Sequence, residues 1–236
     1  MTLIEWLGST AFVSFGAPTS WVEVVGFVTG ATCVVLVARQ SVWNWPIGIA
    51  NNLAFVLLFF GAGLFADAAL QFVYIALAVS GWVLWVGGGT QGPLVVTSTS
   101  RREWWWLGAV GGAATVAMTW FLDTATTSTV PFWDAVTTVL SLLATWGQVT
   151  KRRESWFLWI AADVVYVPLY LYKDLVLTGV LYLGFIALCV AGLSAWTRSM
   201  NDDRVEVRHE ARADHRQVLS AARGPPRDGP VRRHGG

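Results

Sequence analysis

The sequence predicts an all-α polytopic membrane protein, and three observations carry that prediction. Of the 236 residues, 55% are hydrophobic and 13% are charged, and that charged share is about half the share found in soluble domains. The apolar residues gather in seven helix-length stretches, and the first part of the chain is repeated in the last part. No stretch alternates apolar and polar residues as the strands of a membrane barrel do, so a helical bundle is favoured.

A helix needs about 20 mainly apolar residues to cross the hydrocarbon core of a bilayer. Seven stretches approach or exceed this length, and the short linkers between them hold turn-forming and charged residues. The predicted spans are residues 21–38, 43–60, 66–87, 104–121, 132–149, 156–172 and 175–196.

The N-terminal segment, residues 1–20, lacks the basic start of a cleavable signal peptide. We expect it to be a short interfacial helix outside the cytoplasm. The side chains expected to touch lipid are Leu3, Ile4, Trp6 and Leu7.

Basic residues set the orientation of membrane proteins, because Lys and Arg accumulate on the cytoplasmic side. With seven spans, every basic residue except Lys173 falls on the side of the C-terminus. The sequence therefore predicts a multi-pass protein of a bacterial plasma membrane, with its N-terminus outside and its C-terminus in the cytoplasm.

The C-terminal tail, residues 198–236, differs from the rest in composition. Arginines recur every fourth residue from Arg204 to Arg216 with acidic residues beside them, which favours a short solvated helix with paired charges. After Arg223 the tail is rich in Gly, Pro and Arg, a composition typical of disorder. No aromatic residues are interleaved with the arginines, so a nucleic-acid partner is not expected.

An internal repeat is the most informative pattern. Residues 44–85 align with residues 155–196 without a gap, and Trp45 then meets Trp156. A Gly-x-x-x-Trp sequence closes both copies, and Asn52 falls on Asp163.

The repeat defines the predicted domains. Residues 21–87 and 131–197 form two three-helix repeats, and residues 88–130 form a linker that contains the fourth helix. A shift of four helices preserves direction, so the copies are parallel in a 3+1+3 arrangement. Carriers built in this way hold their site between the repeats, near the middle of the membrane.

Asp163 is the strongest candidate for that site. A carboxylate within a span costs about 2.5–3.5 kcal/mol on insertion scales and invites a functional explanation, and no span contains a Lys or Arg to pair with it. Helical spacing places Trp156, Trp159 and Tyr166 on the same broad face. The alternative is a purely structural hydrogen bond of Asp163.

Further substrate-binding candidates lie on the other spans. They are Trp45, Asn51 and Asn52 in the second span, Gln71 and Tyr74 in the third, and Trp133 and Asp134 at the outer end of the fifth. Asn51 and Asn52 lie about 100° apart on the helix, so the two remain alternatives. The alternatives for Gln71 and Asp134 are an interhelical bond and a wetted helix end.

The chemistry of these residues points to binding and away from catalysis. Aromatic rings and an unpaired carboxylate suit a flat, hydroxylated, neutral or cationic molecule, whereas a phosphate would call for Arg or Lys. Cys33 and Cys189 lie singly in apolar stretches, and all three histidines lie in the tail. No enzyme activity, metal or cofactor is therefore expected.

Several motifs together resemble the PnuC family of nicotinamide riboside transporters, over residues 20–196. They are Ser20-Trp21-Val22-Glu23, Leu64-Phe65-Ala66-Asp67-x-x-Leu70-Gln71, Gly81-Trp82-x-x-Trp85, Pro131-Phe132-Trp133-Asp134 and Trp156-x-x-Trp159-Ile160-x-x-Asp163.

The resemblance implies a SWEET-like bundle, a homotrimer and import of nicotinamide riboside by facilitated diffusion. A cytoplasmic ribosylnicotinamide kinase would then trap the nucleoside by phosphorylation and feed NAD biosynthesis. Asp163 departs from the family, because other members have Asn there. The alternatives are a sister carrier for thiamine or riboflavin, and a membrane sensor that signals through the tail.

Overall fold

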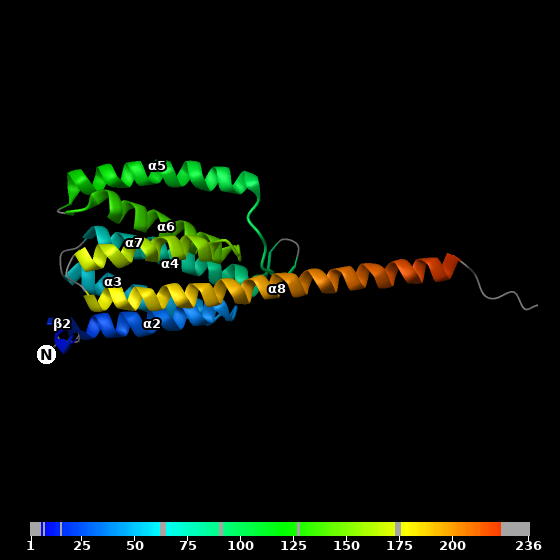
Figure 1. Cartoon of the computed structure of the whole chain (residues 1–236), viewed down its shortest axis with the longest axis horizontal. Coiled ribbons are helices and arrows are strands. Elements are labelled where there is room, and N and C mark those ends of the chain that lie inside the picture. Colours follow the sequence, from blue (N-terminus) through cyan, green and yellow to red (C-terminus); the bar gives the residue numbers. More distant parts are fainter. Residues whose placement is uncertain are drawn as a thin grey trace, which may run out of the picture. The chain divides into compact units, whose positions relative to one another are not determined.

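The computed structural model describes residues 6, 8–14, 16–61, 65–89, 92–126, 128–172 and 176–222 (Figure 1). Within these residues, seven long helices follow a short β-hairpin. The elements are β1 (Thr10–Ser14), β2 (Ala17–Ser20), α2 (Trp21–Ala38), α3 (Asn44–Gly61), α4 (Phe65–Gly87), α5 (Arg101–Ala125), α6 (Pro131–Val149), α7 (Ser155–Tyr172) and α8 (Val176–Ala222).

The seven predicted helices are confirmed, each at its expected place in the chain. Five of the helices, α3, α4, α5, α7 and α8, are long and apolar enough to cross a membrane, and the stretch Val24–Ala38 of α2 is a shorter apolar helix. α5 extends beyond its predicted bounds at both ends. Its first turn is fixed by a capping box in which Ser100 and Glu103 each accept a hydrogen bond from the other's backbone N–H.

In the N-terminal segment Trp6 and Gly8 are helical, and an unpredicted β-hairpin follows from Thr10 to Ser20. β1 and β2 pair antiparallel, and Gly16 supplies a positive φ of 83° at the turn between them. Glycine reaches this conformation without the clash that a Cβ would bring. The ring of Trp6 stacks on Trp21 at 5.2 Å, while Leu3, Ile4 and Leu7 lie outside the described residues.

The chain divides into two compact units, Met1–Arg198 and Ser199–Gly236. The second unit is helical as far as Ala222, so the helix expected after the last span is present and is longer than predicted. The sequence contains no Gly or Pro between Gly192 and Gly224 to end the helix. Residues 223–236, which we expected to be disordered, lie outside the described residues.

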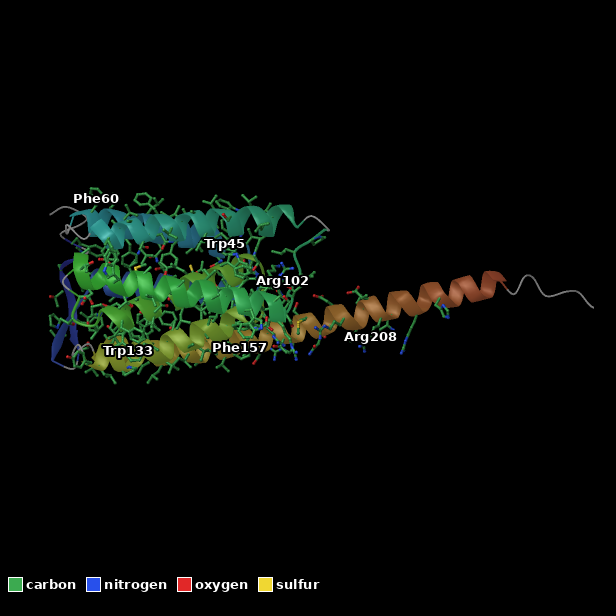
Figure 2. The ribbon with its side chains drawn as sticks, turned by 90° about the horizontal axis from the view of Figure 1, so that it is seen from above. Trp45, Phe60, Arg102, Trp133, Phe157 and Arg208 are labelled. Atoms are coloured by element: carbon green, nitrogen blue, oxygen red, sulfur yellow. The ribbon has the colours of Figure 1, made fainter. Side chains whose placement is uncertain are left out.

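In the first unit, α3 packs on α4, α6 packs on both α4 and α7, and α2 packs on α3. α5 packs on α6 at one edge of the bundle and leaves Trp105 82% exposed (Figure 1). Figure 2 shows Trp133 toward the end of the bundle that holds the hairpin and Arg102 toward the opposite end. We call this opposite end the basic end, because Arg39 and residues 151–153 also lie in its turns.

Two helix corners at the basic end occupy equivalent positions in the repeat. The α2–α3 corner, residues 39–43, places Gln40 at a φ of 54°. The α6–α7 corner, residues 150–154, places Lys151 at a φ of 49°, and these two are the non-glycine residues with positive φ in the described chain. Gln40 aligns with Lys151 when Trp45 aligns with Trp156. Both copies of the repeated sequence therefore turn their first corner through the same unusual backbone conformation.

Four tryptophans, Trp45, Trp85, Trp156 and Trp196, fill the bundle beside these corners, and we call them the tryptophan layer. The ring of Trp45 lies over Gly81 and that of Trp156 lies over Gly192, where an added Cβ would approach the ring to 2.5 and 2.4 Å. Trp156 is fully buried and meets Trp196 edge to face at 5.5 Å. The two glycines therefore make room for the two indoles at equivalent places.

We call residues 21–87 and residues 131–197 the two halves of the bundle. They also exchange hydrogen bonds. The indole N–H of Trp196 donates to the backbone oxygen of Val37 at 2.9 Å. The indole N–H of Trp85 donates to the backbone oxygen of Gln148 at 3.2 Å. The two donors are equivalent in the repeat, and so are the two acceptors. Each half thus fastens its last tryptophan to the end of the first helix of the other half.

Candidate functional site

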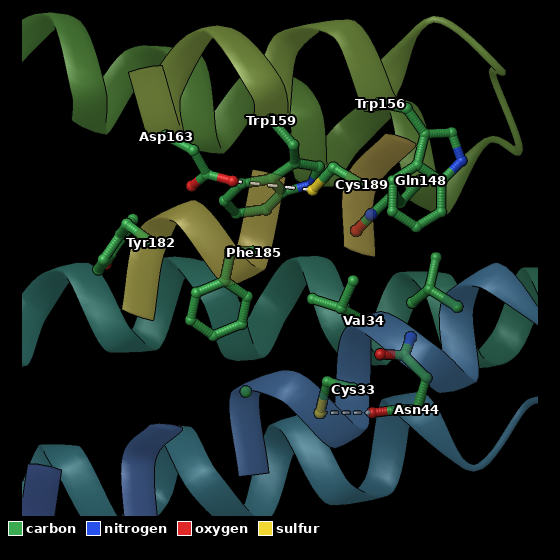
Figure 3. A pocket seen from close by; sticks show the side chains of 12 residues that line it. Cys33, Val34, Asn44, Gln148, Trp156, Trp159, Asp163, Tyr182, Phe185 and Cys189 are labelled. Carbon is green, nitrogen blue, oxygen red and sulfur yellow. Dashed lines mark hydrogen bonds between the residues drawn. The ribbon is translucent and has the colours of Figure 1, made fainter. Parts of the chain in front are cut away.

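A pocket of about 260 Å³ lies between the two halves, directly beside this tryptophan layer (Figure 3). Five helices contribute to it, with the largest share from α7 and α8 on one side and α2 on the other. The lining residues are Gly30, Cys33, Val34, Val37, Asn44, Gln148, Trp156, Trp159, Asp163, Tyr182, Phe185 and Cys189.

Asp163 is the acidic group among these lining residues, and none of them is a Lys or Arg. Asp163 is 4% exposed, and its carboxylate accepts a weak hydrogen bond from the thiol of Cys189 at 3.7 Å (Figure 3). A thiol offsets little of the cost of burying a charge. The carboxylate therefore remains available to a cationic or hydrogen-bonding ligand.

Aromatic rings form the walls next to the carboxylate. Trp159 comes from α7, one helical turn before Asp163, and Tyr182 and Phe185 come from α8 (Figure 3). The indole N–H of Trp159 is buried and has no hydrogen-bond partner among the described residues. Buried indole N–H groups usually have a partner, so this one is a free donor beside the pocket.

Two amide side chains line the pocket toward the basic end. Asn44 begins α3 and Gln148 lies in the last turn of α6, and both are buried. Cys33 of α2 lies beside Asn44, with its sulfur 3.8 Å from the backbone oxygen of Asn44. These groups supply further donors and acceptors for ring substituents or hydroxyls.

The structure brings together three of the predicted site residues, Trp156, Trp159 and Asp163, in this pocket. Trp45 lies instead in the tryptophan layer, edge to face with Trp85 at 5.2 Å. Asn51 accepts a hydrogen bond from the hydroxyl of Thr29 at 3.0 Å and thus bridges α3 and α2. Asn52 and Gln71 are half-buried and do not line the pocket.

A cluster of tyrosines adjoins the pocket on the side away from the basic end. The ring of Tyr166 lies 4.9 Å from that of Tyr182, a pocket residue. The hydroxyls of Tyr166 and Tyr74 both lie beside Ser141 of α6. These two predicted residues therefore border the pocket wall without lining the pocket.

Trp133 and Asp134 lie apart from this pocket. Trp133 is 48% exposed and lines a second, apolar cavity of about 450 Å³ together with Pro168. Asp134 accepts a hydrogen bond from the hydroxyl of Ser128 at 2.6 Å, close to the start of α6. This bond ties Asp134 to the turn that precedes α6.

The residues that sequence reasoning missed are Cys33, Asn44, Gln148, Tyr182, Phe185 and Cys189. One signal was available: the alignment of the two repeats places Gln71 on Tyr182 and Tyr74 on Phe185. The candidates Gln71 and Tyr74 thus occupy positions in the first repeat that are equivalent to two pocket-lining residues of the second repeat.

Comparison with known proteins agrees with this architecture. The chain matches the family model described as nicotinamide mononucleotide transporter over residues 20–198. In the crystal structure of the vitamin B3 transporter PnuC, a similar fold covers 77% of this chain and 83% of that one, with a TM-score of 0.61 and 24% identity.

Two relatives are similar over most of their length. The riboflavin/roseoflavin transporter RibM of Streptomyces davaonensis is 32% identical over 206 residues, which cover 85% of this chain and 96% of RibM. The nicotinamide riboside transporter PnuC of Escherichia coli is 23% identical over 213 residues, which cover 79% of this chain and 89% of that protein. The chain therefore belongs to the nicotinamide mononucleotide transporter family and is a membrane transport protein, not an enzyme.

Proposed function

We propose that this protein imports nicotinamide riboside across a bacterial plasma membrane by facilitated diffusion. The buried carboxylate of Asp163 carries the proposal, because it faces a pocket whose lining contains no basic side chain. Nicotinamide riboside supplies the missing cation on a flat pyridinium ring. A cation placed between a carboxylate and aromatic faces is favoured by both.

The pocket also fits the remaining chemistry of the nucleoside. Trp159 and Phe185 offer ring faces for stacking, and Asn44 and Gln148 offer amides for the carboxamide and the ribose hydroxyls. A phosphate group would bring negative charge toward Asp163 without an Arg or Lys to receive it. The proposed substrate is therefore the nucleoside and not its phosphate.

The contacts matched between equivalent positions support the 3+1+3 arrangement of two parallel repeats. Transport by alternating access then follows from movement of one repeat against the other around the pocket. Facilitated diffusion accumulates nothing by itself, so we propose that a cytoplasmic kinase traps the nucleoside and feeds NAD biosynthesis. A C-terminus in the cytoplasm and a homotrimeric assembly belong to the same proposal.

Riboflavin is the second candidate, and the 32% identity to RibM favours it. Riboflavin is also flat and carries a ribityl chain, but it is uncharged and larger than nicotinamide riboside. For riboflavin, Asp163 would act as a hydrogen-bonding group and not as a counter-ion. Nicotinamide riboside therefore requires a negative charge on Asp163, whereas riboflavin requires a hydrogen-bonding group at that position.

Binding calorimetry on the purified protein separates these candidates. The ligands are nicotinamide riboside, nicotinamide mononucleotide, riboflavin and thiamine. We expect heat of binding with nicotinamide riboside and none with its phosphate. Binding of riboflavin alone would move the protein to the second candidate, and tight binding of the mononucleotide would contradict the chemistry assigned to the pocket.

A further inference from the structure

Lys151 connects the two matched corners at the basic end. Its ammonium group donates to the side-chain oxygen of Gln40 at 3.1 Å and lies 4.6 Å from the centre of the Trp85 ring. Lys151 is buried, so its hydrogen bond and cation–π contact are shielded from water. The corners thus meet through their equivalent residues, Gln40 and Lys151.

This contact is linked to the pocket through Trp85, whose indole N–H donates to the backbone oxygen of the pocket residue Gln148. Val37 and Gln148 line the pocket and also accept the indole hydrogen bonds of the tryptophan layer. Each of these two residues lies two positions before a corner.

The α6–α7 corner is fastened to the chain that precedes α5. The backbone N–H of Thr97 donates to the oxygen of Lys151 at 3.0 Å, and the N–H of Arg153 donates to the oxygen of Thr97 at 3.0 Å. Thr97 and Arg152 form a parallel β-bridge. We call residues 96–100 the strap.

Side chains reinforce the strap. The carboxylate of Glu154 accepts hydrogen bonds from the backbone N–H of Thr99 at 2.7 Å and from its hydroxyl at 3.0 Å. The guanidinium of Arg152 donates to the hydroxyl of Thr97 at 2.9 Å and pairs with Glu103 at the start of α5. Burial raises the pKa of Glu154, but the bonds from Thr99 and Arg153 outweigh burial and bring the pKa below its ordinary value.

The α2–α3 corner has a different composition at the equivalent positions. Ser41, Val42 and Trp43 stand where the other corner has Arg152, Arg153 and Glu154. The charged groups that bind the strap are therefore missing from this corner, and Trp43 is 70% exposed. The two corners thus share a backbone conformation, but the α6–α7 corner has charged side chains that bind the strap and the α2–α3 corner has uncharged ones at the equivalent positions.

We propose that the basic end opens on one side only: the α2–α3 corner moves away from Lys151, while the strap holds the α6–α7 corner in place. We call the contact between Lys151 and Gln40 the latch. Lys151 stays in place with the α6–α7 corner, and Gln40 moves with the α2–α3 corner. The proposal rests on transport through the pocket, but its test requires no substrate, so it can fail independently of the proposed function.

Labelling of Cys33 measures the opening, because this native thiol lines the pocket. A membrane-impermeant maleimide is applied to each side of the membrane in turn, in whole cells and in inside-out vesicles. Mass spectrometry then gives the rate at which the peptide containing Cys33 is labelled. The chain is used at full length in its membrane.

The first variant removes the latch. In Lys151→Met we expect labelling from the basic end to rise by roughly fivefold, because the variant loses the cation–π contact with Trp85 and the hydrogen bond to Gln40. Arg102→Met removes an exposed charge at the same end and should leave the rate unchanged. An unchanged rate in Lys151→Met would overturn the assignment of the latch.

The second variant locks the strap. Thr97→Cys with Arg152→Cys places two thiols at a β-bridge, where strand spacing of about 4.8 Å suits a disulfide. The backbone bonds of Thr97 remain. After oxidation we expect Cys33 to be labelled from the basic end at the rate measured before oxidation. Labelling that stops on oxidation and returns with reductant would show that the strap must open, and would contradict one-sided opening.

Discussion

Trp156 lies against Gly192 so closely that a Cβ on the glycine would come within 2.4 Å of the indole ring. Trp156 is fully buried and also meets Trp196 edge to face at 5.5 Å, so a shift of the ring would disturb the tryptophan layer. The contact joins the first turn of α7 to α8, and its equivalent joins Trp45 to Gly81. Both contacts belong to the tryptophan layer, which lies beside the pocket.

Gly192→Ala should therefore destabilise the protein, by about 1–3 kcal/mol, as overpacking of a filled core does. Gly184→Ala is the matched control on the same helix, since a Cβ there meets nothing within 4 Å. Thermal unfolding in detergent measures both. Equal unfolding temperatures for the two variants would contradict the close packing of Trp156 on Gly192.

Asp163→Asn removes the charge from the pocket but keeps the shape and the hydrogen-bonding capacity of the side chain. If the ligand is a cation, its Kd should rise by about 10- to 100-fold, the range of one charged hydrogen bond. Asp67→Asn, at an exposed position, is the control. Titration calorimetry gives both constants, and an unchanged Kd in Asp163→Asn would remove the carboxylate from the site.

Trp159→Ala removes a ring from the pocket wall and should weaken binding by about tenfold, because a stacked aromatic pair contributes about 0.5–1.5 kcal/mol beyond its buried area. Trp159→Phe keeps a ring face and should lose less. Trp105→Ala, on the exposed face of α5, should bind like the parent chain. A loss of affinity in Trp105→Ala equal to that in Trp159→Ala would refute a specific role for Trp159.

Truncation after Arg198 tests the role of the second unit. All pocket residues lie within the first unit, Met1–Arg198. We expect the shortened chain to take up substrate at the parent rate per folded molecule. A sensor that signals through its tail would bind the ligand without taking it up, so binding without uptake by the parent chain would favour that alternative.

Acid should release the strap only at low pH. A carboxylate whose folded pKa is lowered contributes stability above its ordinary pKa and loses it as the pH falls through the folded value. Glu154 is such a group, so the amide of Thr99 should stay protected from hydrogen exchange through the range in which an ordinary Glu is protonated. In Glu154→Gln, hydrogen exchange of the Thr99 amide should be faster at neutral pH. Unchanged protection in this variant would show that the carboxylate of Glu154 contributes little to holding the strap.

The helices could be predicted from the sequence because each is a long apolar run between linkers with turn and charge signals. The hairpin could not, since β1 has five residues and β2 has four, too few for a clear alternation. The length of α8 could not be predicted either, because a change from apolar to charged residues marks the expected membrane surface and not the end of a helix.

Three of the predicted site residues line the pocket. Asp163 stood out as a carboxylate in an apolar run, and helical spacing added Trp159 and Trp156. Asn44 and Gln148 lie at helix ends, where polar residues are ordinary, so nothing in the sequence distinguished them. Their place in the pocket depends on which helices meet across the two halves, and that packing is visible only in three dimensions.

Uptake into proteoliposomes that contain only this protein tests the central claim most directly. Labelled nicotinamide riboside should equilibrate across the membrane with saturable kinetics, without ATP or an ion gradient, and Asp163→Asn should slow it. Unlabelled mononucleotide should not compete. Saturable uptake of riboflavin with no uptake of nicotinamide riboside would contradict the proposed substrate, and uptake of neither would contradict the proposed function.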